Sequence, residues 1–144
     1  MNFVYLSLGA NIGEPKAQLK QALILLEEHN DIIITKKSKI ITTKAWGKTD
    51  QNNFLNMVVE IKTSIYPERL LEICLKVEKS MGRERNEKWG PRLIDIDIIA
   101  YEKIEVKTKN LTLPHPHAFE RDFVLNPLRE IAPRMANWII EQAK

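Results

Sequence analysis

The chain has 144 residues, of which 44% are hydrophobic and 28% charged, with a net charge of +3. This length is enough for one buried core but too short for two ordinary domains, so we expect a single domain over residues 1–144. The basic residues are spread along the chain, which argues against a nucleic acid as a partner and suits a small anionic ligand.

Two further features of the sequence indicate the cellular compartment in which we expect the protein. No apolar run approaches the ~18 residues needed to span a bilayer, and no secretory signal precedes the first strand-like run. The single cysteine, Cys74, falls on the apolar stripe of a predicted helix and cannot form an internal disulfide, which is typical of a core residue in a reducing compartment. We therefore expect a cytoplasmic protein without a membrane partner, and one that can act as a monomer.

The hydrophobic periodicity predicts six elements in a β-α-β-β-α-β order. These are a strand over 3–8 closed by a turn at Gly9, a helix opening at Glu14-Pro15, a long strand over 31–43, a strand over 54–64, a helix opening at Tyr66-Pro67 and ending at Gly82, and a strand carrying Asp95 and Asp97. Polar loops over 44–53 and 83–92 separate them. This order indicates an α+β, ferredoxin-like fold, an antiparallel sheet with helices on one face.

The residues after Tyr101 are expected to form an appendage to this core. A hairpin through Val106 and Leu111 is followed by the segment Leu113-Pro-His-Pro-His117 and by short helices that Pro127 and Pro133 should interrupt. Prolines 114 and 116 force the histidine segment into an extended or turn conformation. Histidines two apart in such a segment are a weak zinc signal, and the neighbouring hard carboxylates argue against a zinc centre.

Asp95 and Asp97 alternate with isoleucine in an otherwise apolar strand. Because side chains alternate between the faces of a strand, the two carboxylates share one face, with roughly 6.5–7 Å between their Cα atoms. At that spacing they can converge on one hard cation or bridge two. The wet face of a half-exposed strand is the alternative, but Asp is depleted in strands and aligned like charges repel. Arg92, just upstream, adds a phosphate-binding cation and favours a metal-bound phosphate ester as ligand.

Taken in order, the motifs resemble those of the 6-hydroxymethyl-7,8-dihydropterin pyrophosphokinase family. They are Ser7-Leu-Gly-Ala-Asn11, Thr43 with Trp46-Gly47, Phe54-Leu-Asn56, Gly82-Arg-Glu-Arg85, Trp89-Gly-Pro-Arg92 with Asp95-Ile-Asp97, Leu113-Pro-His115-Pro, and Arg121-Asp-Phe123-Val-Leu125. The resemblance implies a ferredoxin-like enzyme that transfers the β,γ-pyrophosphoryl group of ATP to the hydroxymethyl group of the pterin and releases AMP.

The resemblance also implies a role for each site residue. Two Mg²⁺ ions would be held by Asp95 and Asp97, which with Arg83, Arg85 and Arg92 form the catalytic set. ATP would contact Glu78, Arg85, Trp89, Arg92, Ile98, Thr112, His115 and Arg121. The pterin would lie between Phe54 and Phe123, with Trp89 as a lid, and would also contact Thr43, Trp46, Asn56 and Asp95.

Two other functions fit parts of the pattern. A palm-like nucleotidyltransferase also places paired aspartates on such a sheet, but it attacks the α-phosphorus and releases pyrophosphate. A noncatalytic ligand- or RNA-binding module would need exposed aromatic and basic residues across the strands, where Asp95 and Asp97 repel phosphate in the absence of metal.

Overall fold

The computed structural model describes residues 1–44, 53–82 and 94–144. In chain order these form β1 (Asn2–Ala10), α1 (Pro15–Glu27), β2 (Ile32–Lys37), β3 (Ile41–Thr43), β4 (Phe54–Thr63), α2 (Pro67–Ser80), β5 (Asp95–Tyr101), β6 (Val106–Lys107), β7 (Thr112–Leu113), the short 3₁₀ helix η1 (Ala118–Glu120), α3 (Asp122–Ile131) and α4 (Pro133–Gln142). Within these residues, no helix is long and apolar enough to cross a membrane.

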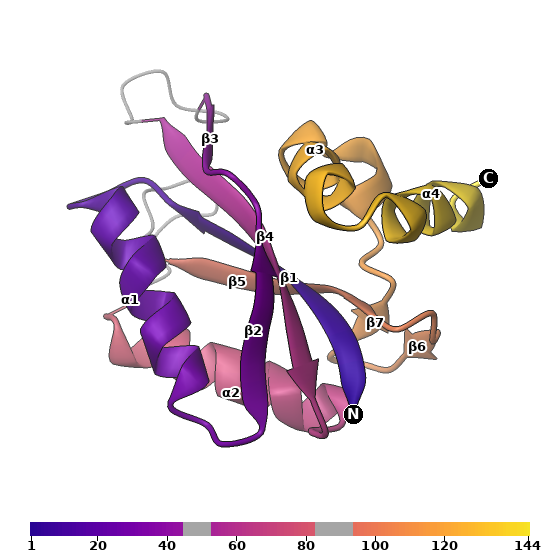
Figure 1. Cartoon of the computed structure of the whole chain (residues 1–144), viewed down its shortest axis with the longest axis horizontal. Helices are drawn as coiled ribbons and strands as arrows, with labels where there is room; N and C mark the ends of the chain where they lie inside the picture. The colour runs from indigo at the N-terminus through magenta and orange to yellow at the C-terminus, as the bar shows by residue number, and fades with distance from the viewer. Residues whose placement is uncertain (45–52, 83–93) are drawn as a thin grey trace.

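The central sheet is antiparallel, with strand order β2-β4-β1-β5 and the short β3 paired with β4. Strand β1 therefore lies in the middle and β5 at an edge (Figure 1). The predicted ferredoxin-like α+β arrangement is confirmed. A separate two-stranded ribbon, β6-β7, follows β5, as the sequence predicts.

Helices α1 and α2 cover one face of the sheet. Each begins with a proline, whose missing N–H costs nothing in the first helical turn. Their apolar stripes pack against the alternate residues of β1 and β4 that point to this face, such as Leu6, Leu8 and Ile61. Cys74 is fully buried in this layer, as predicted.

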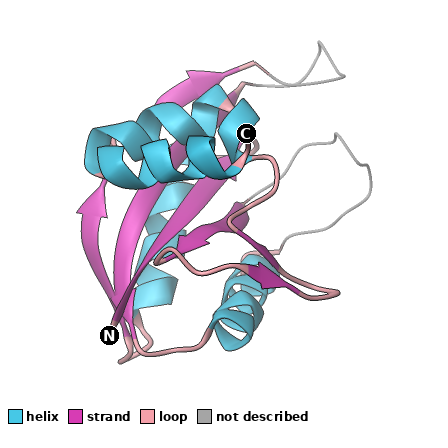
Figure 2. Cartoon of the chain, turned by 90° about the vertical axis from the view of Figure 1, so that its right-hand side faces the viewer, coloured by secondary structure: helices cyan, strands magenta, loops and turns pink. Residues whose placement is uncertain are grey.

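Helices α3 and α4 cover the opposite face, where Val124, Leu128 and Ile139 meet Tyr5 and Val58 of the sheet. Figure 2 shows this helix pair lying across the strands. The segment that the sequence assigns to an appendage is thus a second packing layer. The site described below lies on this side of the sheet.

Three local predictions were wrong. The strand expected over 31–43 is two strands, because a Ser38 side-chain contact replaces part of the backbone pairing with β4. The Ser38 N–H donates to the Val58 carbonyl, and the Ser38 Oγ accepts the Val58 N–H, both at 2.9 Å. Gly9 is a strand residue of β1, not the start of a turn. Pro127 lies inside α3 and does not interrupt it, whereas Pro133 does begin a new helix.

Candidate active site

One row of residues across the sheet forms the floor of the candidate site. In the strand register Asn56 of β4 pairs with Gly9 of β1, and Gly9 pairs with Asp95 of β5. Because side chains two apart on a strand share a face, Phe54 lies on the same face as Asn56, and Asp97 on the same face as Asp95. An aromatic ring, an amide and two carboxylates are thereby gathered at one end of the sheet.

Gly9 makes room for Asn56 in the middle of this row. A Cβ built on Gly9 would lie 2.7 Å from Oδ1 of Asn56, closer than such atoms approach in proteins. The missing side chain therefore leaves space for the Asn56 amide, whose oxygen lies over Gly9. At this position β1 adds no side chain of its own to the floor of the site.

Asn56 is 5% exposed and held by a specific contact. Its Nδ2 donates to Oγ1 of Thr43 at 2.7 Å, which joins β4 to β3. A buried amide is costly unless its groups are paired, so this hydrogen bond fixes the plane of the amide. The structure thus brings together the two residues that the sequence assigns to the polar edge of the pterin site.

The two aspartates stand at the start of the edge strand β5. Asp95 is half-buried and Asp97 exposed, while Ile96 between them is buried on the other face. The predicted shared face of the carboxylates is confirmed. Ser7 of β1, which is 6% exposed, pairs with Asp97 in the register.

Carboxylate oxygens on one strand suit Mg²⁺, which binds one or two carboxylates and fills its remaining positions with substrate phosphates and water. The described part of the chain contains no cluster of three or more His, Cys, Asp or Glu side chains arranged for a metal ion. An all-protein metal cage is therefore absent from those residues. The carboxylates of Asp95 and Asp97 fit a cation that enters together with a phosphate ligand, whose oxygens complete the coordination.

The segment after β7 brings a histidine, an arginine and an aromatic ring to the same side. His115 is tied to the edge strand, since its N–H donates to the Ile99 carbonyl at 2.8 Å. Burial, and then the positive charges of Arg121 and His117, lower the pKa of His115 to about 4. The Arg121 guanidinium lies 5.8 Å from the centre of the Phe123 ring, within the range of a cation–π contact.

Three predicted ATP contacts lie around the edge strand. Glu78 of α2 is 4% exposed, and its Oε2 accepts the Ile96 N–H at 2.7 Å, so it supports the backbone between the two aspartates. The side chain of Ile98 is buried in the layer of α1 and α2, on the face opposite the aspartates. Thr112 is half-buried in the β6-β7 ribbon.

Five predicted site residues lie outside the described residues. They are Trp46, Arg83, Arg85, Trp89 and Arg92. Their roles stay predictions.

Sequence reasoning missed several residues that the structure places at the site. Gly9 and Ser7 were quoted as part of a motif but given no role; a register alignment of the first and last core strands could have found them. His117 was considered only as part of a weak zinc signal, and Glu120 was given no role. Their i, i+3 spacing was the available signal, but a short 3₁₀ turn has no periodicity from which to predict it.

The paired carboxylates on one face of this sheet, with Arg121 and His115 on the same side, suit an enzyme that acts on phosphate esters or anhydrides with a divalent cation. Comparison with known proteins narrows this class. Residues 5–133 match the model of the family described as 7,8-dihydro-6-hydroxymethylpterin-pyrophosphokinase, and the chain belongs to this family.

Curated relatives agree with that assignment, and a solved structure agrees with the fold. The chain is 45% identical over 134 residues to the 2-amino-4-hydroxy-6-hydroxymethyldihydropteridine pyrophosphokinase of Bacillus subtilis, covering 93% of this chain and 80% of the relative. It is 47% identical to the protein of the same name from Methylorubrum extorquens, covering 92% and 84%. A crystal structure of Plasmodium falciparum HPPK-DHPS has the same fold, with a TM-score of 0.68 at 17% identity, over 92% of this chain and 40% of that one.

Proposed function

We propose that this protein transfers the β,γ-pyrophosphoryl group of ATP to the hydroxymethyl group of 6-hydroxymethyl-7,8-dihydropterin, giving the pterin diphosphate and AMP, in folate biosynthesis. Membership of the family supports the reaction. The observation that ties it to this structure is the row Asn56–Gly9–Asp95, which sets an amide and a carboxylate on either side of a strip of β1 backbone that carries no side chain of its own.

The pterin binds over this strip. A pterin is a flat heteroaromatic ring with several donors and acceptors, so it needs apolar walls and a polar edge contact. Phe54 and Phe123 supply the walls from opposite sides of the site, one on β4 and one on α3. Asn56, fixed by Thr43, contacts the polar edge, and Asp95 lies near the hydroxymethyl end. Trp46 and Trp89 belong to the same proposal on the ground of the family motif.

The triphosphate lies along β5, between the aspartates and the His115 segment. His115 and Arg121 contact phosphate oxygens, and Arg92 joins them by the family motif. Glu78, Ile98 and Thr112 surround the nucleoside; because the Ile98 side chain is buried in the core, its contact comes from the main chain.

Asp95 and Asp97 would hold two Mg²⁺ ions, which would neutralise charge on the triphosphate and make the β-phosphorus a better electrophile. Asp95 and Asp97 fix the β-phosphorus relative to the pterin hydroxyl for in-line displacement. The cationic side chains of Arg83, Arg85, Arg92 and Arg121 stabilise charge on the transferred group and on the leaving AMP.

Alignment of hydroxyl and phosphorus, together with stabilisation of the developing charge, supplies most of the acceleration in such a transfer. His115 is a poor candidate for the base, because its low pKa matches a hydrogen-bonding role better than proton abstraction at neutral pH. The proposed mechanism therefore assigns no general base among the described residues.

Product analysis tests the proposal. The protein is incubated with Mg²⁺, ATP and 6-hydroxymethyl-7,8-dihydropterin, and the nucleotide product is identified. We expect AMP in an amount equal to the pterin diphosphate, and only when the pterin is present. Formation of ADP, release of pyrophosphate as a nucleotidyltransferase would do, or no turnover would overturn the proposal.

A further inference from the structure

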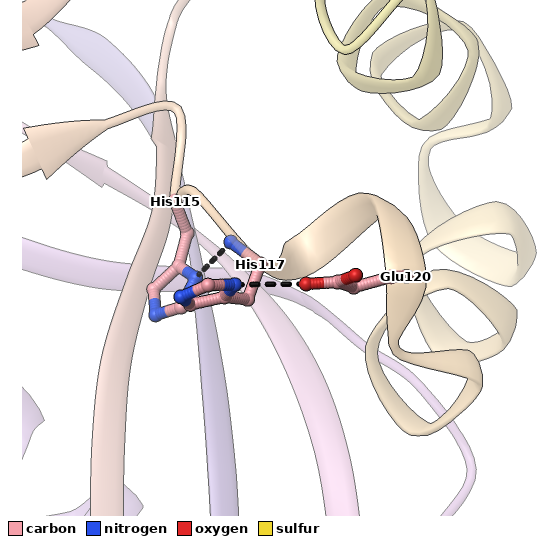
Figure 3. A network of polar contacts seen from close by, with 3 residues as sticks. All are labelled: His115, His117 and Glu120. Atoms are coloured by element: carbon pink, nitrogen blue, oxygen red, sulfur yellow. Dashed lines mark hydrogen bonds and ion pairs between the residues drawn. The ribbon is translucent and has the colours of Figure 1, made fainter.

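The His-Pro-His segment contains hydrogen bonds that a simple phosphate contact does not require. The backbone N–H of His117 donates to Nδ1 of the His115 ring at 3.2 Å, and Nδ1 of His117 lies 2.8 Å from Oε1 of Glu120 (Figure 3). The two imidazole rings meet edge to face, with centroids 6.1 Å apart and planes at 62°. One side of His115 is therefore already engaged by the protein.

This contact determines which ring nitrogen of His115 carries the proton. A ring nitrogen that accepts a hydrogen bond has no proton of its own, so the neutral ring is protonated at Nε2. Burial disfavours the doubly protonated, charged ring, and the nearby charges of Arg121 and His117 add to this effect. The ring thus presents Nε2–H, and no net charge, to whatever lies beyond it.

We propose that His117 and Glu120 are positioning residues that hold His115 as the neutral Nε2–H tautomer, so that His115 binds a triphosphate oxygen as a neutral hydrogen-bond donor and not as a cation. This inference rests on the proposed function for the identity of the ligand. Because His115 is then neutral, Arg121 supplies the positive charge that faces the triphosphate from this segment.

Glu120 acts through the turn that joins His115 to Arg121. Within this turn the Ala118 N–H donates to the His115 carbonyl and the Glu120 N–H to the His117 carbonyl, both at 3.2 Å. The His117–Glu120 contact closes the same turn with side chains. It fixes where the His117 N–H points, and hence which nitrogen of His115 it meets. Both side chains are more than half exposed, so the expected effect of removing the contact is modest.

Nuclear magnetic resonance tests the tautomer directly and without substrate. The full chain is labelled with ¹⁵N-histidine, and long-range ¹H–¹⁵N spectra distinguish protonated from unprotonated ring nitrogens. The signals of His115 are identified by their loss in His115→Gln. We expect an unprotonated Nδ1 and a protonated Nε2 at neutral pH, with no change down to about pH 5.5. A proton on Nδ1, or a doubly protonated ring, at neutral pH overturns the proposal.

Steady-state kinetics test the positioning role. Glu120→Ala should raise the KM for ATP roughly two- to fivefold, with kcat and the KM for the pterin unchanged. Glu120→Gln keeps an acceptor for the His117 ring and should restore the lower KM. An unchanged KM for ATP in Glu120→Ala, or equal losses in both variants, contradicts the role of Glu120.

A comparison at position 115 tests the type of donor. His115→Gln keeps a neutral N–H near the place of Nε2, whereas His115→Lys supplies a cation. We expect the Gln variant to retain more ATP affinity than the Lys variant, and the reverse order overturns the neutral-donor assignment. Failure of the wild-type protein to form AMP would refute the proposed function instead, and would leave the spectroscopic result standing.

Discussion

Nδ2 of Asn56 donates a hydrogen bond to Oγ1 of Thr43 over 2.7 Å, and so links β4 to the short strand β3. The amide is almost fully buried, and its oxygen lies over Gly9, where a side chain would collide with it. The orientation of Asn56 is thus set by one neighbour on each side. A change to either neighbour should alter pterin binding before it alters ATP binding.

Replacing Thr43 removes the acceptor for the Asn56 amide. We expect Thr43→Val to raise the KM for the pterin roughly five- to thirtyfold, corresponding to about 1–2 kcal/mol for an unpaired buried group. The KM for ATP should stay the same. Thr42→Val is the matched control, because Thr42 is exposed on the same strand; an equal effect of the two variants would show that β3 has been disturbed as a whole.

Adding a methyl group at Gly9 should displace the Asn56 amide. The 2.7 Å contact of the added Cβ with Oδ1 forces the amide to move, so Gly9→Ala should raise the KM for the pterin about tenfold or more. The double variant Gly9→Ala/Asn56→Ala provides the control. If Gly9 acts through Asn56, the double variant loses little more than Asn56→Ala alone; additive losses would argue against this coupling.

Removing one carboxylate from β5 should stop turnover without unfolding the protein. Asp97 is exposed and lies outside the apolar core, so Asp97→Ala should lower kcat by roughly 100-fold or more and leave the circular dichroism spectrum and thermal midpoint unchanged. The exposed Asp31 offers a control, since Asp31→Ala should retain full activity. Loss of activity that parallels unfolding would sink the metal-binding role.

Tyr5 should matter for stability and not for catalysis. Its hydroxyl donates to Oε2 of the buried Glu60 at 2.6 Å, while Oγ1 of Thr35 donates to Oε1 at 2.7 Å. Tyr5→Phe leaves one carboxylate oxygen of Glu60 without this donor, and should lower the free energy of unfolding by about 1–3 kcal/mol. Urea denaturation measures this change. Tyr66→Phe, at a position 64% exposed, should have no effect.

The same tyrosine gives stability a dependence on alkaline pH. Burial, together with the hydrogen bond to Glu60, raises the pKa of Tyr5 above its usual value of 10.0. The folded protein therefore holds this proton more tightly than the unfolded chain, and the associated stability is complete below about pH 10 and lost as the pH rises further. Stability of the wild type should fall more steeply in this range than that of Tyr5→Phe. Parallel curves would contradict the assignment.

Cys74 should report global unfolding. The side chain is fully buried in the layer of α1 and α2, and burial, with smaller contributions from Glu78 and Asp97, raises the pKa of its thiol to about 12. Because the thiolate is the reactive form, a thiol reagent should label Cys74 only when the protein unfolds. The labelling rate should rise with urea in step with the unfolding transition. Rapid labelling in native buffer would show that α2 opens locally.

The sequence predicted the core of the fold because its elements have strong local signals. Proline and acidic residues mark the start of α2, and the two-residue period predicts that Met57, Val59 and Ile61 share a face, which packs in the layer of α1 and α2. The shared face of Asp95 and Asp97 follows from the same two-residue period. These features depend on neighbours in sequence and needed no knowledge of tertiary contacts.

The remaining differences come from tertiary contacts that no local pattern encodes. The Ser38 side chain accepts the Val58 N–H in place of a backbone carbonyl, and this ends β2 early. Pro127 stays inside α3, a helix packed against the sheet through Val124 and Leu128. The row Asn56–Gly9–Asp95 depends on three strands in one register. The contact of the His117 N–H with the His115 ring is local, but it forms at the start of a short 3₁₀ turn, which has no periodicity from which to predict it.

The proposed pterin site draws on segments that lie far apart in the chain. Thr43 comes from β3, whereas Phe123 comes from α3, and the Lys39 N–H just before β3 donates to the Glu130 carboxylate, 91 residues away. A chain cut before α3 would lose the proposed Phe123 wall together with the layer that covers Tyr5 and Val58. Such a truncation should destabilise the sheet and abolish binding of the acceptor ring at the same time, so the fold and the proposed recognition of the pterin depend on the same late segment of the chain.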